Sequence, residues 1–159
     1  MDSRSVVASF LACWSVQDLE MAVAHTHPDI VYTIHNGRDA SPLAGAYRGP
    51  EACRDLGYAM LAEFDYLTYE PTIVAVEGNI VRAQVNFRYR HRNTGNIIEG
   101  SRRLVFEIRD ELIYRLDSYE DTLRLEAFMR MSREVPPIAT DLLEPFNLQI
   151  GRQKSGAGA

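Results

Sequence analysis

The stretch "NIVRAQVNFRYRHRNTGNIIEGSRRLVFEIRDELIYRLDSYED", residues 79–121, decides the fold of this chain. Apolar and polar residues alternate along it with a period of two, which is typical of β-strands that bury one face. Turn residues divide it into strands at 80–92, 97–109 and 112–120, and the preceding segment, 66–77, has the same character. Because the links between these segments are short, neighbouring strands should pair antiparallel as a meander.

Counting residues across the turns predicts which side chains share a face of the sheet. Turns at Gly78-Asn79, Thr94-Gly95 and Asp110-Glu111 predict the pairs Val74–Ala83, Val76–Val81, Phe87–Arg102, Leu104–Asp117 and Arg102–Tyr119. The apolar face then collects Val74, Val76, Val81, Val85, Phe87, Tyr89, Leu104, Phe106, Ile108 and Ile113. The opposite face collects Arg82, Gln84, Asn86, Arg88, Arg90, Arg103 and Glu107.

This register predicts that Asp117 lies on the apolar face, together with Arg102, Arg115 and Tyr119. An ionised carboxylate on a buried apolar surface is costly unless it is paired or reached by water. Arg115 and Arg102 are the expected partners. A polar cluster inside an apolar cup is typical of a small-molecule pocket, and a purely structural Arg–Asp–Arg network is the alternative that the sequence leaves open.

Helical patterns precede the meander. Apolar residues recur at helical spacing from Val6 to Trp14, and Ser15 followed by Asp18 resembles the capping box of a second helix. "DIVYTIH", residues 29–35, predicts a strand, and the Gly- and Pro-rich residues 36–49 predict a loop. Pro50 opens a third helix at a position where its missing N–H costs nothing. This order predicts an α+β fold with helices over one face of a curved sheet.

The length of 159 residues fits one domain, which we expect to span 1–132. Asp121 should cap a last helix carrying Leu125, Phe128 and Met129. Residues 133–159 form a C-terminal extension that we expect to pack on the domain or on a partner subunit and to be flexible at its end.

Composition excludes several function classes. The net charge of −5 argues against a nucleic-acid binder, and no apolar run reaches the length that crosses a bilayer. With two cysteines and no export signal, we expect a cytoplasmic protein. Phosphate-binding, dinucleotide-binding and serine-nucleophile motifs are absent, so no cofactor is implied. His25 and His27 lack further ligands at a suitable spacing, so no metal is expected either.

The other parity of the last strand is also apolar. Leu112, Tyr114 and Leu116 would form a stripe on the outer face of the sheet. Exposed apolar stripes often mark subunit contacts, and we therefore expect a homodimer through this face.

The segments "FLACWSVQDLEMAVAHTHPDIVY", "YRGPEACRDL" and "ELIYRLDSYEDT" together resemble the nuclear transport factor 2-like superfamily, in its SnoaL-like and ketosteroid-isomerase-like branch, over residues 4–132. The resemblance implies a cone: a strongly curved, mostly antiparallel sheet wrapped around a pocket and covered by about three N-terminal helices. Proteins of this fold are commonly dimeric.

The resemblance has mixed implications for activity. The positions that match the catalytic residues of ketosteroid isomerases are Phe10, Leu104 and Ile34 or His35. All of them depart from that constellation, so steroid isomerisation by that constellation is not expected. SnoaL-like polyketide cyclases use an aspartate on the last strand as general acid and base, and Asp117 matches that position.

These observations lead to the hypothesis of general acid–base catalysis, of isomerase, cyclase or dehydratase type, on a small and largely apolar carbonyl compound. Asp117 would move a proton, and Arg102, Arg115 or Tyr119 would stabilise the enolate oxygen. Expected ligand contacts are Tyr32, Phe87, Tyr89, Leu104, Phe106, Trp14 and His35. A non-catalytic ligand-binding or protein-interaction module of the same fold is the alternative.

Overall fold

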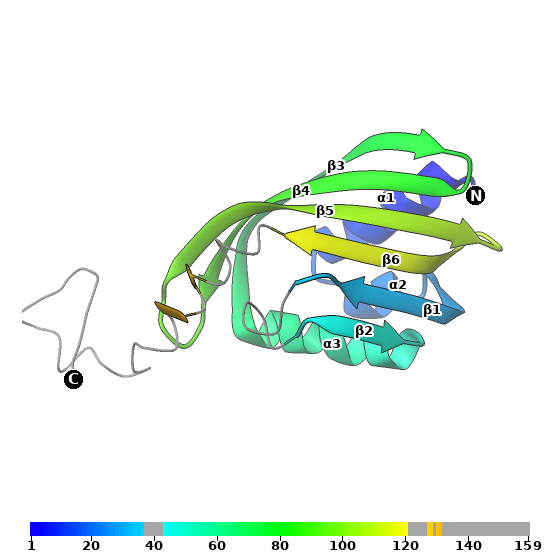
Figure 1. Cartoon of the computed structure of the whole chain (residues 1–159). Helices are drawn as coiled ribbons and strands as arrows, with labels where there is room; N and C mark the ends of the chain where they lie inside the picture. Colours follow the sequence, from blue (N-terminus) through cyan, green and yellow to red (C-terminus); the bar gives the residue numbers. More distant parts are fainter. Residues whose placement is uncertain (37–42, 121–126, 129, 132–159) are drawn as a thin grey trace, which may run out of the picture.

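The computed structural model describes residues 1–36, 43–120, 127–128 and 130–131. Three helices and six strands follow one another as α1 (Ser3–Ser15), α2 (Leu19–Val23), β1 (Thr26–Ile34), β2 (Gly45–Arg48), α3 (Pro50–Glu63), β3 (Phe64–Glu77), β4 (Ile80–His91), β5 (Ile97–Arg109) and β6 (Leu112–Glu120). The strands form one sheet in the order β2-β1-β6-β5-β4-β3 (Figure 1). All pairs are antiparallel except β1 with β6.

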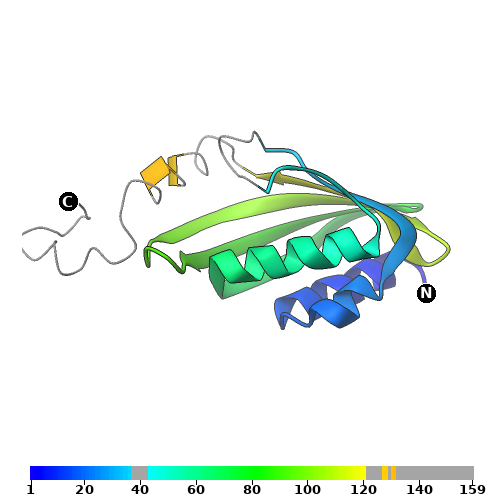
Figure 2. The same cartoon turned by 90° about the horizontal axis from the view of Figure 1, so that it is seen from below.

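The sheet is curved, and its helices cover one face. Figure 2 shows α1, α2 and α3 together beneath the sheet, on its concave side. This arrangement confirms the predicted α+β class and the four strands of the meander. None of the described helices is long and apolar enough to cross a membrane.

The helices begin where the sequence supplies caps. The side chain of Asp2 accepts a hydrogen bond from the Ser5 amide at 2.8 Å at the start of α1. Asp18 does the same for Met21 in α2, at 3.2 Å, so the predicted cap at Ser15 is wrong; Ser15 instead donates to the Leu11 carbonyl. Short polar side chains satisfy the free amides of a first turn in this way.

The helix α3 starts as predicted, with Pro50 in its first turn. Gly49 precedes it with φ of 88°, a conformation that favours glycine. Residues 45–48, predicted as loop, form the short edge strand β2 beside β1. A strand of four residues is too short to carry a clear alternating pattern.

The hairpin of β4 and β5 keeps the predicted faces with a different register. Phe87 lies opposite Gly100, and Val85 lies opposite Arg102, a shift of two residues from the predicted pairs. A shift of two preserves which side chains point inward, because the side-chain period of a strand is two. The residues of β4 accordingly alternate between buried and exposed along almost its whole length.

A bulge in β3 overturns one predicted pair. Val76 pairs with Val81 as expected, but Ile73, not Val74, pairs with Ala83. Val74 is the extra residue and is 58% exposed. A bulge bends its strand and increases the local twist, so this irregularity also contributes to the curvature of the sheet.

A bulge in β6 overturns the predicted position of Asp117. The turn at Asp110 and Glu111 has positive φ at both residues and sets Ile113 opposite Ile108, as predicted. The register then slips by one residue at Tyr114. Beyond the slip, the observed pairs are Val105–Asp117, Leu104–Ser118 and Arg102–Glu120. A slip of one residue moves every later side chain to the other face, so Asp117 points outward, and Ser118 and Glu120 point inward.

The same bulge takes one residue out of the predicted outer apolar stripe. Leu116 is 2% exposed and belongs to the core, whereas Leu112 and Tyr114 stay partly exposed. The ring of Tyr114 carries the Arg109 guanidinium 3.9 Å above it and contacts the His27 ring edge-on. The homodimer through this face stays a prediction, without Leu116 in its contact.

Parts of the predicted C-terminal region lie outside the described residues. These are the predicted cap Asp121, Leu125 and Met129 of the last helix, and the whole extension at 133–159. Phe128 is described, and it is buried against Phe64 and His91.

Candidate functional site

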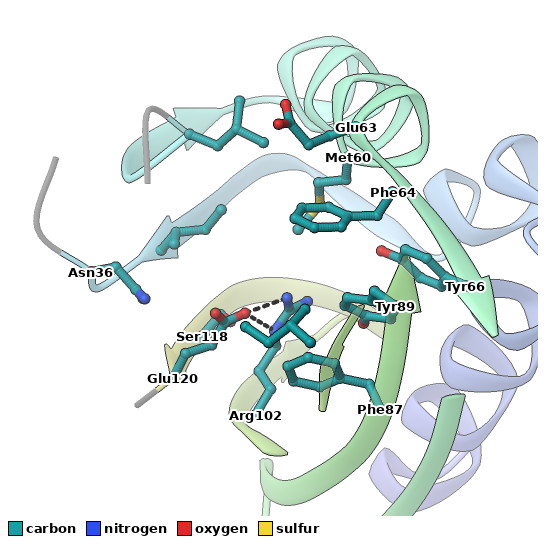
Figure 3. A pocket seen from close by; sticks show the side chains of 13 residues that line it. Asn36, Met60, Glu63, Phe64, Tyr66, Phe87, Tyr89, Arg102, Ser118 and Glu120 are labelled. Atoms are coloured by element: carbon teal, nitrogen blue, oxygen red, sulfur yellow. Dashed lines mark hydrogen bonds and ion pairs between the residues drawn. The ribbon is translucent and has the colours of Figure 1, made fainter. Parts of the chain in front are cut away.

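A cavity lies between the concave face of the sheet and the end of α3 (Figure 3). It holds about 690 Å³ of empty space, including the solvent at its mouth. Its apolar walls are Ile34, Leu43, Met60, Phe64, Phe87 and Ile98. Its polar lining consists of Asn36, Glu63, Tyr66, Tyr89, Arg102, Ser118 and Glu120.

An ion pair between Arg102 and Glu120 forms the charged centre of this cavity. The two residues are direct neighbours on β5 and β6. Nε and Nη2 of Arg102 both donate to Oε1 of Glu120, Nε at 2.8 Å. Their side chains are only 9% and 11% exposed. Burial opposes the charge on Arg102, but the carboxylate of Glu120 and the surrounding tyrosines raise the pKa of the guanidinium well above its ordinary value.

A stack of aromatic rings forms the wall beside the ion pair. Tyr89 lies parallel to Tyr66 and to Phe87, with ring centroids 4.2 Å and 4.3 Å apart. The Phe87 ring lies over Gly100, where a Cβ atom would come within 3.2 Å of it. The absence of a side chain at Gly100 thus makes room for the stack.

Tyr89 brings an unusual hydroxyl to the cavity. Its side chain is 3% exposed, and among the described residues its hydroxyl oxygen has no hydrogen-bond partner. Burial raises the pKa of the neighbouring Tyr66, and Arg102 and the polar contacts of Tyr66 with Tyr89 and Trp14 oppose this rise, but the Tyr89 oxygen is not at full hydrogen-bonding geometry. Burial raises the pKa of Tyr89 well above its ordinary value, so its hydroxyl keeps its proton.

A second carboxylate borders the cavity at the end of α3. Oε2 of Glu63 lies 2.6 Å from Nε2 of His91, and Nδ1 of His91 lies 3.1 Å from the Thr94 hydroxyl. His91 is buried, and the Phe64 and Phe128 rings pack against it. This chain of contacts fixes the orientation of Glu63.

The other predicted catalytic residues lie outside the cavity. Asp117, on the outer face, has Oδ1 2.8 Å from Nε2 of His35 and 3.7 Å from Nη2 of Arg115. Tyr119 stacks on the His35 ring with centroids 4.5 Å apart, and Arg103 lies over the Tyr119 ring. Of the four predicted catalytic residues, Arg102 lines the cavity, while Asp117, Arg115 and Tyr119 form an outer cluster with His35.

The predicted ligand contacts divide into four groups. Phe87 and Tyr89 line the cavity. Tyr32 and Trp14 line a smaller apolar space between the helices and the sheet, where burial raises the pKa of Tyr32 to about 12. Leu104 and Phe106 lie in the packed core, and His35 lies on the outer face.

Sequence reasoning missed Glu120 and Ser118 because it did not include the bulge in β6, and it missed Asn36 because it assigned residues 36–49 to a loop. A signal was present: Ile113 and Leu116 are three residues apart and both apolar, and both are buried in the structure. A regular strand cannot bury two residues at that spacing, because successive side chains alternate between faces. A bulge between them resolves the conflict.

The described residues give little support to a cysteine nucleophile or to a metal site. Cys53 is buried, and desolvation raises the pKa of its thiol to about 11, which disfavours a reactive thiolate. No group of three His, Cys, Asp or Glu side chains within the described ranges could hold a metal ion.

Comparison with known proteins gives a family model and related folds. A model of the SnoaL-like domain matches residues 7–116. A search of the curated proteins finds no match.

Three solved structures illustrate the likeness in fold. An NTF2-like protein from Burkholderia thailandensis E264 is 23% identical, with a TM-score of 0.72 over 81% of this chain and 98% of its own. TerC, co-crystallised with polyporic acid, is 16% identical, with a TM-score of 0.69 over 80% of this chain and 95% of its own. A protein from Mesorhizobium loti, provisionally assigned as a SnoaL-like polyketide cyclase, is 16% identical, with a TM-score of 0.64 over 75% of this chain and 99% of its own.

Proposed function

Because the chain belongs to the SnoaL-like family, we propose that it is a small-molecule enzyme that acts by general acid–base catalysis on a largely apolar carbonyl compound. The reaction is of isomerase, cyclase or dehydratase type. Glu120 takes the role that the sequence suggested for Asp117. The observation that carries the proposal is a buried carboxylate and an unpartnered hydroxyl in one apolar cavity.

Glu120 acts as the base. Its hydrogen bonds with Arg102 hold the carboxylate in position within the cavity, which a general base requires. Oε1 accepts both hydrogen bonds from Arg102. This leaves the second carboxylate oxygen, Oε2, as the atom that would approach the substrate.

Tyr89 stabilises the developing charge. A protonated hydroxyl in a low-dielectric cavity is a strong hydrogen-bond donor to an enolate oxygen, because it is already in place and no solvent has to reorganise when the negative charge forms. The raised pKa of Tyr89 keeps it in the donor form at neutral pH. The aromatic wall of Phe87 and Tyr66 suits a flat apolar ring beside it.

Two of the related folds support a small organic ligand. TerC was crystallised with polyporic acid, and the Mesorhizobium loti protein carries a provisional polyketide cyclase assignment. Their identity to this chain is low, so they support the class of molecule and leave the substrate open.

A binding module is the second candidate. The pairing of Arg102 with Glu120 favours it, because a carboxylate that is already engaged is less available for proton transfer. In that case the same cavity would hold a ligand and leave it unchanged.

Hydrogen exchange at the activated carbon of β-tetralone in heavy water tests the proposal. The Glu120 carboxylate would take a proton from the carbon next to the carbonyl, the C–H electron pair would form the enolate, and Tyr89 would donate to its oxygen. The carboxyl group would exchange with the solvent and return a deuteron to the carbon. Exchange is followed by proton NMR.

Two variants decide between the carboxylates. Glu120→Gln should slow exchange about a hundredfold or more, while Asp117→Asn should leave it unchanged because Asp117 lies outside the cavity. Exchange that is insensitive to Glu120→Gln would refute the proposed base. Binding of β-tetralone to the wild-type protein without exchange would favour the binding module.

A further inference from the structure

Asn36 carries a buried side-chain amide without a hydrogen bond to any of the described residues. Its side chain lines the cavity, is buried with the residue only 8% exposed, and neither Oδ1 nor Nδ2 has a partner among the described residues. A buried polar group without a partner costs about 1–3 kcal/mol. Such groups are rare in native proteins and take a partner that the described residues do not supply, such as water or a ligand.

The strand phase aims this amide into the cavity. Ile34 points inward opposite Ser118, and the His35 amide donates to the Ser118 carbonyl, so Asn36 is the next inward position beside Glu120. Asn36, Glu120 and Arg102 thus form one polar row across β1, β6 and β5. Figure 3 shows Asn36 pointing into the cavity from the side opposite Tyr66 and Tyr89.

The charges around the cavity disfavour an anion at this end. Arg102 is the sole cationic side chain among the described lining residues, and it is engaged by Glu120. Glu63 adds a second carboxylate on the opposite wall, held by His91. A carboxylate ligand beside Asn36 would therefore face negative charge without a free cation to offset it.

We infer that Asn36 recognises a neutral group with one hydrogen-bond donor and one acceptor side by side, as in a carboxamide. The amide of Asn36 pairs with such a group through both of its polar atoms. The ligand is then a flat, neutral ring system that carries this group at one end and, at the other, an oxygen that accepts from Tyr89. The inference rests on the proposed use of this cavity and names the substrate class.

Three matched naphthalene probes test the inference by isothermal titration calorimetry. They are β-naphthol, a hydroxynaphthamide with its carboxamide on the ring opposite the hydroxyl, and the corresponding hydroxynaphthoate. Two additional neutral hydrogen bonds should make the naphthamide bind about tenfold more tightly than β-naphthol. The naphthoate, which is an anion at neutral pH, should bind about tenfold more weakly than the naphthamide.

Variants of Asn36 assign the preference to this residue. In Asn36→Leu, the naphthamide should bind no more tightly than β-naphthol does, so that the tenfold advantage disappears. Asn36→Asp, which keeps the shape but replaces the donor by a charged acceptor, should also remove it. Asn86→Leu is the matched control, because Asn86 lies exposed on the outer face of β4.

The outcomes are separable from those of the exchange experiment. Equal affinities for the three probes, tightest binding of the naphthoate, a preference that survives Asn36→Leu, or no binding of any probe would each overturn the inference. A lost naphthamide preference together with exchange that depends on Glu120 leaves the catalytic proposal intact. An Asn36-dependent preference together with exchange that is insensitive to Glu120→Gln supports the ligand class alone.

Discussion

Arg102 and Glu120 are a buried ion pair whose two charges depend on each other. Each side chain is about nine-tenths buried, and the surrounding residues are tyrosines and apolar side chains. Removing both charges from water is costly, and the mutual attraction offsets this cost only while both partners are present. The net contribution of the pair to the free energy of unfolding is therefore smaller than the loss measured when only one of the two residues is replaced.

A single substitution in this pair should be strongly destabilising. Arg102→Met leaves Glu120 buried without a partner and should lower the free energy of unfolding by about 3 kcal/mol, measured by urea denaturation. The matched control is Arg88→Met, since Arg88 pairs with Glu99 at 2.8 Å on the outer face of the same two strands, with both side chains exposed. That loss should stay below about 1 kcal/mol. Equal losses in the two variants would contradict the assignment of a buried pair.

At the scale of elements, the bulge at Tyr114 decides which side chains enter the cavity. It displaces the second half of β6 by one residue relative to β5. As a result, Leu116 packs in the core, Glu120 meets Arg102, and Asp117 meets His35 on the outer face. Because of this one inserted residue, the carboxylate that faces the cavity is that of Glu120 and not that of Asp117.

The contact between α2 and α3 depends on a glycine. A Cβ atom at Gly57 would lie 2.6 Å and 2.7 Å from the two methyl carbons of Leu19, which is 4% exposed. Gly57→Ala should gain about 1 kcal/mol of helix propensity, but the overlap in a packed interior should cost about 1–3 kcal/mol.

We therefore expect Gly57→Ala to lower the free energy of unfolding by roughly 1 kcal/mol, measured by urea denaturation. Adding Leu19→Val, which shortens the side chain that the new methyl group meets, should recover part of the loss. A stabilised Gly57→Ala variant would show that Leu19 moves aside without cost.

At the scale of the whole molecule, the interior of the cone is rich in tyrosine. Tyr32, Tyr66, Tyr69 and Tyr89 come from three strands and surround Arg102. Burial raises the pKa of each above the ordinary value of 10.0, to about 12 for Tyr32 and well above the ordinary value for Tyr89. Arg102 opposes the rise in each case but does not cancel it.

This cluster predicts a loss of stability at alkaline pH. A raised pKa means that the folded state holds its protons more tightly than the unfolded chain, so the contribution is fully present below about pH 10. It should be lost as the pH rises from about 10 to 12, by up to about 1.4 kcal/mol per pH unit for each buried tyrosine. Denaturation at several pH values and the absorbance of tyrosinate measure both effects.

Tyr32→Phe should make the dependence on pH shallower in that range, since one of the titrating groups is gone. If the native protein instead ionises all of its tyrosines near the ordinary pKa, without unfolding, the cluster is more open to water than its burial indicates.

The sequence alone determined the class of the fold. Alternation with a period of two placed four strands of the meander within two residues of their observed bounds, because a sheet with one buried face imposes that period on its residues. It also found the start of α3 at Pro50 and the cavity residues Arg102, Phe87 and Tyr89. These three side chains lie on β4 and β5. The pairing of these two strands differs from the predicted register by two residues, and an even shift keeps each side chain on its predicted face.

Only the tertiary structure decided which carboxylate faces the cavity. The bulge at Tyr114 arises because Ile113 and Leu116 both have to be buried against the helices and neighbouring strands, and a regular strand cannot bury both. The local sequence does not specify at which residue of the strand the bulge forms. The inward position of Glu120 and the outward position of Asp117 therefore follow from packing between distant segments.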